Sequence, residues 1–323
     1  MRYYVVQRLA QFLVVFVLVT FGVMVLLRFG LDAPGDPART MLGGYPDQAL
    51  IDATNAKYHL NSNYFVQYLH WLKGLVIDQD LGYSTSNSLA VCSLISRRIG
   101  VTMLLGFYGV SVALIIAVPL AVAQAHWRDR MFDKMSSYTA FVFVSVPAIV
   151  TAVFLKLLFV EHWHVFPRIA DKVYPWQDPL EHVRNFALPV LTLALPAAAV
   201  FARLLRADMS TTLQSDFIAL TRTTGMSPKR ILWRHALPNS LLSLVTSVGV
   251  QVSVVFGGAL VAETFFDLDG MGLLLITAVL SYDLFTVQAI TAILVIFVVV
   301  TNLLVDLLYT VIDPRVRLAS AER

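Results

Sequence analysis

The sequence is poor in charged residues and in cysteine. Only 14% of its 323 residues are charged, whereas 58% are hydrophobic, and the mean hydropathy is +0.72. Because a soluble globular domain carries about 25% charged residues, this composition indicates an integral membrane protein. Cys92 is the single cysteine, which excludes an intrachain disulfide framework and a multi-cysteine metal site.

Catalytic and nucleotide-binding motifs are missing as well. No G-x-x-x-x-G-K-[ST] phosphate-binding loop occurs, and the nearest glycine–lysine neighbourhood, residues 225–229, lacks both the spacing and the hydroxyl. Neither an H-E-x-x-H zinc motif nor a G-x-S-x-G nucleophile elbow is present. We therefore predict that the chain is not an enzyme, has no catalytic or metal-binding residues, and depends on another subunit for any ATP hydrolysis.

Long apolar runs dominate the chain. A helix that crosses about 30 Å of hydrocarbon needs roughly 20 residues. Runs near that length lie at residues 9–28, 101–124, 136–160, 186–206, 241–262 and 287–312. They predict an all-α integral membrane protein with about six transmembrane helices. Pro147, Pro189 and Pro196 fall inside these runs, where they either mark kinks or broken helices or are simply tolerated.

The placement of Lys and Arg predicts the orientation, because short cytoplasmic loops carry an excess of both. With cytoplasmic termini, the inside segments hold Arg2, Arg8, Arg128, Arg130, Lys134, Arg203, Arg206, Arg222, Lys229, Arg230, Arg234, Arg315, Arg317 and Arg323. The outside segment 263–288 holds acids and no Lys or Arg, although Arg168, Lys172 and Arg184 fall in another outside loop. We predict an uncleaved first span, both termini in the cytoplasm, and no nucleic-acid partner despite the net charge of +3.

The spans divide the chain into three predicted regions. Residues 1–28 form the first transmembrane helix, residues 29–100 an extracytoplasmic subdomain, and residues 101–323 a five-helix transmembrane core. The core includes a cytoplasmic segment at 207–240. The subdomain contains two stretches patterned as short surface helices, 47–58 and 64–75, the second with Phe65, Leu69 and Leu72 along one face.

The cytoplasmic segment predicts a helix, a tight turn and a second helix. Ser215 and Asp216 can cap the first helix, and Gly225 suits a left-handed stop after it. One face of the first helix carries Phe217, Leu220, Thr221 and Thr224. The second helix has an N-cap serine and an N1 proline, Ser227 and Pro228, and runs towards Pro238.

Segment 216–240, D-F-I-A-L-T-R-T-T-G-M-S-P-K-R-I-L-W-R-H-A-L-P-N-S, resembles the EAA loop of permease subunits in prokaryotic ATP-binding-cassette (ABC) importers. Gly225, Leu237 and Pro238 match the spacing of that loop. The positions that differ are the E-A-A triplet, occupied by Ala219, Leu220 and Thr221, and His235, where isoleucine is usual. The oligopeptide and dipeptide branch of the family is itself loose at the E-A-A triplet.

Three further stretches resemble the permease B type of that dipeptide and oligopeptide branch. The external region contributes P-G-D-P-A at 34–38, Q-Y at 67–68 and D-L-G-Y-S at 80–84. The others are L-V-A-E-T-F-F at 260–266 with G-M-G at 270–272, and N-L-L-V-D-L-L-Y at 302–309 with D-P-R-V-R at 313–317. Because the motifs occur in the right order, the resemblance is specific and covers essentially the whole chain.

The resemblance implies a type I ABC importer permease fold and a mechanism. In such importers a short helix lies in a groove of a cytoplasmic ATPase subunit and transmits closure of the ATPase dimer to the membrane helices. Residues 216–225 match this coupling helix. The implied ATPase-coupling residues are Asp216, Phe217, Ala219, Leu220, Thr221, Thr224, Gly225, Leu237 and Pro238. The alternative is an ordinary amphipathic connector.

The resemblance also implies an assembly and a compartment. A second, homologous permease subunit would complete the translocation path as a heterodimer, and two cytoplasmic ATP-binding subunits would bind ATP and Mg. An extracytoplasmic peptide-binding protein would deliver di- or oligopeptides for import. The chain itself would hold no cofactor and would lie in the lipid bilayer of a prokaryotic plasma (inner) membrane. Nickel, glutathione or another small solute are alternative substrates.

Polar side chains inside the spans are candidates for the translocation path. Gln251, Ser253 and Asn302 can line a water-filled path, or they can only bond neighbouring helices. An ion-coupled secondary carrier or channel is the alternative of a different class. The sequence shows none of the internal repeats that are typical of many secondary transporters.

Three histidines fall in one predicted external loop. His162, His164 and His182 suggest a nickel site, because imidazole suits that metal. Histidine and tryptophan also favour the membrane interface, and Trp163 and Trp176 lie in the same loop. We favour the interfacial interpretation and predict no metal site.

Overall fold

The computed structural model describes residues 2–32, 37–42, 44–86 and 89–312 of the chain. Within these ranges the chain is helical and contains no β-strand, only one isolated antiparallel bridge between Tyr83 and Ala90. The all-α prediction is therefore confirmed for the described residues. The motif residues 34–36 and 313–317 lie outside them.

Contacts between residues divide the chain into two compact units. The first unit combines residues 1–100 with residues 269–300, and the second combines residues 101–268 with residues 301–323. Each unit therefore brings together segments that are distant in the sequence.

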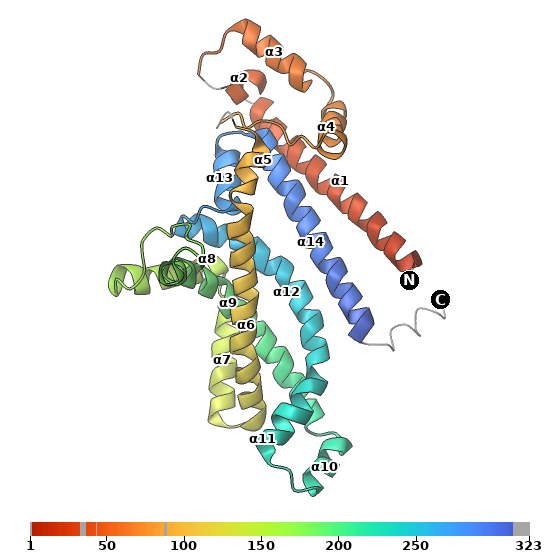
Figure 1. The fold of residues 1–323 in the computed structure, drawn as a ribbon, viewed down its shortest axis with the longest axis vertical. Helices are drawn as coiled ribbons and strands as arrows, with labels where there is room; N and C mark the ends of the chain where they lie inside the picture. The colour runs from red at the N-terminus through yellow and green to blue at the C-terminus, as the bar shows by residue number, and fades with distance from the viewer. Residues whose placement is uncertain (1, 33–36, 43, 87–88, 313–323) are drawn as a thin grey trace. The chain divides into compact units, whose positions relative to one another are not determined.

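The first unit contains two long helices and several short ones (Figure 1). They are α1 (Arg2–Asp32), α2 (Pro37–Leu42), α3 (Gln48–Tyr58), α4 (Tyr64–Lys73), the π-helical turn η1 (Gly74–Asp78), α5 (Val91–Ser96), α13 (Met271–Leu280) and the first part of α14 (Leu284–Ile312). Helices α3 and α4 confirm the two short helices predicted between residues 47 and 75.

Polar contacts fix α4 to the rest of the first unit. The Tyr68 hydroxyl lies 2.9 Å from the Thr20 hydroxyl of α1, and the Gln67 side-chain amide donates to the Leu60 carbonyl at 3.1 Å. These bonds turn Gln67, Tyr68 and Trp71 inward. The face that carries Phe65, Leu69 and Leu72 is largely exposed: Phe65 and Leu69 are 58% and 46% exposed, and Leu72 is half-buried. Bonded polar groups set the rotation of this helix, since burying them unbonded would cost free energy.

Asp283 holds residues 84–86 against the start of α14. Its buried carboxylate accepts hydrogen bonds from the hydroxyls of Ser84, Ser86 and Thr286. The backbone N–H of Thr286 also donates to it, at 3.3 Å. A buried carboxylate is costly unless it is hydrogen-bonded, so this network fixes one arrangement of the loop.

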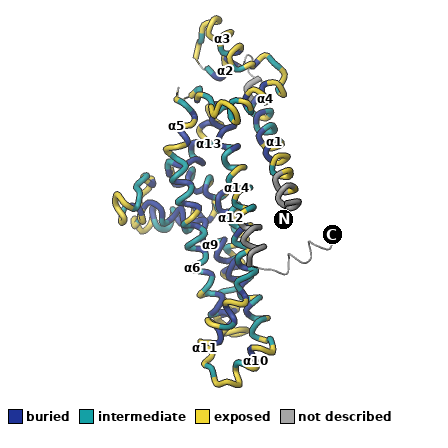
Figure 2. The backbone as a smooth tube through the Cα atoms, turned by 45° about the vertical axis from the view of Figure 1, so that its right-hand side comes forward, coloured by how far each residue is buried: buried dark blue, intermediate teal, exposed yellow. Residues whose placement is uncertain are grey.

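The second unit is built around one long buried helix. Its elements are α6 (Ile99–His126), α7 (Met131–Ser145), α8 (Ala148–Lys156), the π-helical turn η2 (Leu157–His162), α9 (Pro179–Thr212), α10 (Asp216–Thr223), α11 (Pro228–Ile231), the π-helical turn η3 (Leu232–Ala236) and α12 (Leu237–Phe266). Helix α9 packs against α7, α8 and α12, and Figure 2 shows buried residues along it. A side chain at Gly106 of α6 would meet the Phe256 ring of α12 at 2.3 Å, so glycine permits this close approach.

The described residues contain five helices that are long and apolar enough to cross a membrane, or six when one bent pair counts as a span. The bent pair is α7 with α8 and η2, which meet at 106°. Pro147 lies at this break as the N-cap of α8, and Val146 before it is extended, as residues preceding proline tend to be. Pro189 and Pro196 remain inside α9. The prediction of about six transmembrane helices is thus confirmed.

Candidate functional site

Helix α10 begins and ends as the local sequence predicts. Ser215 is extended and occupies the N-cap position, and Gly225 beyond the helix has φ +75°, the predicted left-handed conformation. One detail differs: the Ser215 hydroxyl donates to the Thr212 carbonyl at 2.5 Å and caps no N–H of α10. Asp216 in the first turn favours the helix through its charge near the positive end of the helix dipole.

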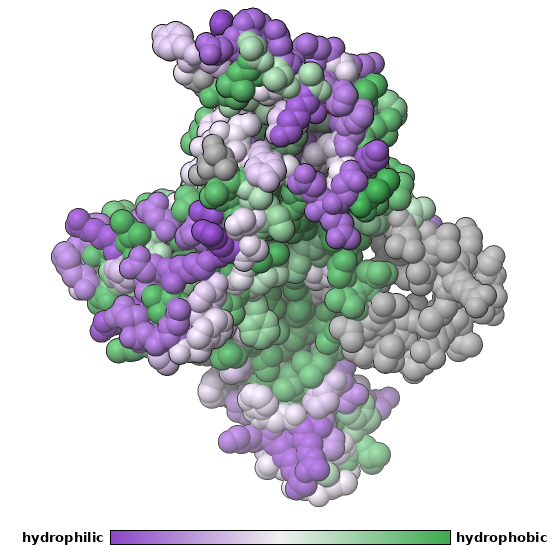
Figure 3. All heavy atoms as spheres, turned by 45° about the horizontal axis from the view of Figure 1, so that its top comes forward, coloured by the Kyte–Doolittle hydropathy of each residue, from purple (hydrophilic) through white to green (hydrophobic). Residues whose placement is uncertain are grey.

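Helix α10 buries one side chain and exposes two large apolar ones. Ile218 is fully buried, whereas Phe217 is 43% exposed and Leu220 is 69% exposed. We call Phe217 and Leu220 the α10 patch. Around the patch, Asp216, Ala219, Thr224 and Gly225 are exposed and Thr221 is half-buried. Hydrophilic side chains gather at the end of the second unit that carries α10 and α11, with hydrophobic ones beside them (Figure 3).

The segment after α10 leads directly into α12. Ser227 is the extended N-cap and Pro228 the first residue of α11, as predicted. The helix does not stop before Pro238, because α11, η3 and α12 form one helical stretch from Pro228 to Phe266. The N–H of Leu237 reaches the Leu232 carbonyl five residues back. This wider turn lies immediately before Pro238, which cannot donate a backbone hydrogen bond.

Hydrogen bonds clamp the end of α9 to the start of α12. The hydroxyls of Thr212 and Ser240 lie 3.0 Å apart, and the Ser243 hydroxyl donates to the Asp208 carboxylate. Met209 between them is fully buried. Leu237 is buried and Pro238 exposed at the same end of α12. These contacts fix the end of α9 to the start of α12, and packed helices with bonded ends move as rigid elements.

An ion pair links α7 to the same end of α9. The guanidinium of Arg206 donates to both carboxylate oxygens of Asp133, at 2.5 and 2.6 Å. The N–H of Asp129 also donates to Asp133, at 2.9 Å. Asp133 is almost fully buried, so the paired geometry offsets the cost of burying its charge. Sequence reasoning used Arg206 only as a marker of orientation and missed this link.

The predicted path residues lie on α12 and α14. The Ser253 hydroxyl donates to the Asn302 side-chain oxygen at 3.4 Å, so the structure brings these two residues together. Gln251 is half-buried two residues before Ser253, and Asn302 is exposed. These positions can contact water or a neighbouring chain. The contact between Ser253 and Asn302 joins α12 to α14.

The three histidines of the predicted external loop differ in their surroundings. Both ring nitrogens of His182 have partners, Nδ1 with the Val173 carbonyl at 2.6 Å and Nε2 with the Tyr108 hydroxyl at 3.2 Å. His162 and His164 are exposed. Among the described residues, no three His, Cys, Asp or Glu side chains are grouped closely enough to hold a metal ion.

Two protein-family models match the chain. The model of the binding-protein-dependent transport system inner membrane component matches residues 109–318. The model of the N-terminal part of such membrane components matches residues 1–106. The two matches together leave only short segments of the chain uncovered.

Similar full-length proteins have names that describe peptide permeases. A peptide permease protein of Brucella suis biovar 1 (strain 1330) is 33% identical over 321 residues, which cover 97% of this chain and 98% of that protein. The oligopeptide transport system permease protein AppB of Bacillus subtilis (strain 168) is 29% identical over 318 residues, covering 98% and 99%.

A similar fold occurs in a solved transporter. The MetNI methionine ABC transporter in an inward-facing conformation matches with a TM-score of 0.55 and 18% identity, over 69% of this chain and 97% of the matched chain. At this identity the match supports the fold alone, and the fold is that of type I importer permeases. With both family models matching, the chain belongs to the inner membrane components of binding-protein-dependent transport systems, the permease subunits of ABC importers.

Proposed function

We propose that the chain is the permease subunit of an ATP-driven importer of di- or oligopeptides. The proposed substrate rests on the relatives, whose names describe peptide or oligopeptide permeases and whose similarity extends over nearly the full length of both chains. Gln251, Ser253 and Asn302 are proposed to line the path, which this chain would form with a second, homologous permease. If the proposed substrate is wrong, uptake assays should show transport of nickel, glutathione or another small solute instead.

We further propose that α10 is the coupling helix, and one observation carries this proposal. Ile218 is the one buried residue of the helix, while Phe217 and Leu220 of the α10 patch remain exposed at an end of the unit whose other exposed side chains are mostly polar. Exposed apolar side chains among polar ones are typical of interaction sites. A short helix that presents two apolar side chains suits a groove on a partner.

The proposed partner at α10 is a cytoplasmic ATPase subunit. Two such subunits would bind ATP and Mg and supply the hydrolysis. Closure of the ATPase dimer would displace α10, and the Thr212–Ser240 and Asp208–Ser243 hydrogen bonds would pass the displacement to α9 and α12. Gly225, Leu237 and Pro238 fix the turn and the helix start on which this transfer depends.

The proposed orientation follows from the same assignment. If α10 meets a cytoplasmic ATPase, residues 207–240 and both termini are cytoplasmic. Residues 29–100 then face outward, where a peptide-binding protein would deliver the substrate. Accessibility labelling of single cysteines in intact cells, in a Cys92→Ser background, would contradict this orientation if position 220 reacted with an impermeant reagent.

The test substitutes one leucine of the α10 patch. In the assembled transporter, Leu220→Asp should lower ATP-dependent uptake of a radiolabelled dipeptide by about tenfold or more, as expected for a central interface residue. Leu180→Asp is the matched control, because Leu180 is also an exposed helix leucine, at 62%, and lies at the opposite end of α9 from α10. Full uptake by Leu220→Asp with normal membrane insertion would refute the coupling role. Uptake of nickel but of no peptide would refute the proposed substrate.

A further inference from the structure

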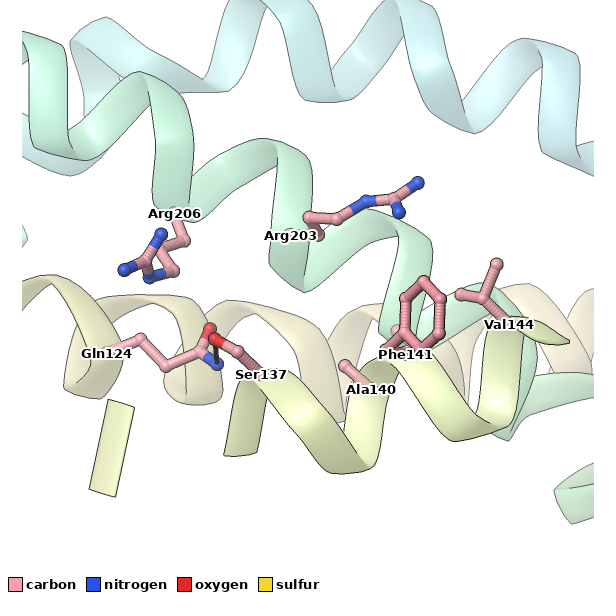
Figure 4. A pocket seen from close by; sticks show the side chains of 8 residues that line it. Gln124, Ser137, Ala140, Phe141, Val144, Arg203 and Arg206 are labelled. Carbon is pink, nitrogen blue, oxygen red and sulfur yellow. Dashed lines mark hydrogen bonds between the residues drawn. The ribbon is translucent and has the colours of Figure 1, made fainter. Parts of the chain in front are cut away.

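A pocket lies between α6, α7 and α9, away from the α10 patch. Its volume is about 200 Å³. Its walls are made by Gln124 of α6, by Ser137, Ala140, Phe141 and Val144 of α7, and by Ala199, Arg203 and Arg206 of α9 (Figure 4). The α7 residues follow i, i+3, i+4, i+7 spacing and the α9 residues i, i+4, i+7 spacing. The pocket is therefore formed by one face of each helix.

The two arginines of the pocket differ in whether they have an ion-pair partner. Arg206 is neutralised by its two short bonds to Asp133. Arg203 is exposed and has no ion-pair partner among the described residues. Figure 4 shows Arg206 at the end of the pocket near Gln124 and Arg203 at the end near Phe141. The pocket thus carries one uncompensated positive charge, which favours an anionic ligand.

Hydrogen-bonding groups lie beside that charge. Gln124 is 2% exposed. Its amide nitrogen donates hydrogen bonds to the hydroxyl oxygens of Ser136 and Ser137, at 2.9 and 3.4 Å. Its buried Oε1 has no hydrogen-bond partner among the described residues. A buried acceptor without a partner costs free energy, so a ligand that donates a hydroxyl hydrogen would satisfy it.

The wall on the α7 side is largely apolar and opens onto an exposed apolar surface. Phe141 and Val144 line the pocket and are themselves 64% and 38% exposed. In a membrane helix such a surface suits acyl chains. A charged pocket with an apolar exit on one side selects an amphiphilic anion over a free one, because a free anion gains nothing from the apolar wall.

We propose that this pocket binds an anionic phospholipid with a hydroxylated headgroup, of the phosphatidylglycerol type. Arg203 pairs with the phosphodiester, the Gln124 carbonyl accepts a headgroup hydroxyl, and an acyl chain lies along Phe141 and Val144. Basic pockets between membrane helices bind other anionic phospholipid headgroups, those of cardiolipin and the phosphoinositides. The pocket lies at the end of α9 where Asp133 and Arg206 pair, so a bound lipid would brace the contact between α7 and α9.

The test measures lipid retention by the purified full chain with native mass spectrometry. The wild type is expected to retain phosphatidylglycerol in preference to phosphatidylcholine, and Arg203→Gln should lose about tenfold in phosphatidylglycerol occupancy, the size of one charge-assisted contact. Arg130→Gln is the matched control, because Arg130 is an exposed arginine outside the pocket. Soluble glycerol 3-phosphate should not compete at equal concentration.

A second variant keeps the proposal testable if Arg203→Gln does not fold. Ala140→Trp fills the pocket without changing its charge and should also reduce phosphatidylglycerol retention. Equal retention of both lipids by the wild type would overturn the proposal, and so would unchanged retention in a folded Arg203→Gln or Ala140→Trp chain. Loss of the lipid on assembly with the other subunits would overturn it for the assembled transporter. Full competition by glycerol 3-phosphate would indicate a site for soluble anions and would also overturn it.

Discussion

Helices α4 and α10 are both short, and both expose apolar side chains, yet they are held in opposite ways. Helix α4 buries Gln67, Tyr68 and Trp71 and is fixed by side-chain hydrogen bonds to Thr20 and Leu60. Helix α10 buries only Ile218. Exposure of apolar residues alone therefore does not distinguish the two helices. The number of buried side chains distinguishes them. Helix α4 is fixed within its own unit, whereas another subunit can set the position of α10.

The largest expected effect tests whether the first unit is held by its internal hydrogen bonds. Asp283→Ala removes the acceptor of three side-chain hydroxyls and one N–H, so it should destabilise the chain by about 3 kcal/mol, since buried donors would be left without partners. Thermal unfolding of the purified chain measures this loss. Asp78→Ala is the control, because Asp78 is an exposed helix residue of the same unit. Equal stability of the two variants would show that the network around Asp283 is not important.

The next effect tests the single anchor of α10. Ile218→Ala should cost about 2 kcal/mol, the low end for a buried residue, because a surface helix can partly settle into the space. The loss should be local, so limited proteolysis near residues 216–225 should accelerate while the overall melting temperature changes little. Leu220→Ala is the control and should leave the proteolysis rate unchanged. A large drop in melting temperature for Ile218→Ala would place α10 within the stable core and would break the contrast with α4.

The smallest effect on stability distinguishes backbone strain at Gly225 from a role of this residue in coupling import to ATP hydrolysis. Gly225 and Gly44 both have left-handed backbones, at φ +75° and +59°, and at both positions a Cβ atom would meet only open space. Substitution by alanine should therefore cost about 1 kcal/mol at each site, from backbone strain alone. We expect Gly225→Ala, but not Gly44→Ala, to reduce the peptide imported per ATP hydrolysed. Equal coupling ratios in the two variants would indicate that the turn after α10 has no special role.

Features fixed by local chemistry could be predicted from the sequence. The apolar runs marked the spans, Pro147 marked a possible break, and Gly225 and Pro228 marked the stop of one helix and the start of the next. Each of these depends on a residue's own backbone preference or on the length of an apolar run. The motifs along the chain added the family, which the family models confirm.

Features that depend on packing between distant segments could not be predicted. The sequence pattern of α4 placed Phe65, Leu69 and Leu72 on one face, but it did not show that the buried face carries Gln67, Tyr68 and Trp71. The same limit applies to Ile218 as the anchor of α10. No spacing rule connects Thr212 with Ser240 or Asp133 with Arg206, because these contacts appear only when the helices are packed.

The most direct test of the central claim is a photo-cross-link from the α10 patch. A photoreactive amino acid at position 220 of the chain, in membranes that contain the assembled transporter, should cross-link to a protein that carries a G-x-x-x-x-G-K-[ST] phosphate-binding loop. The same amino acid at position 50 on α3 should give no such product. Cross-linking of position 220 only to lipid, or equal cross-linking of positions 50 and 220 to the ATP-binding protein, would contradict the account.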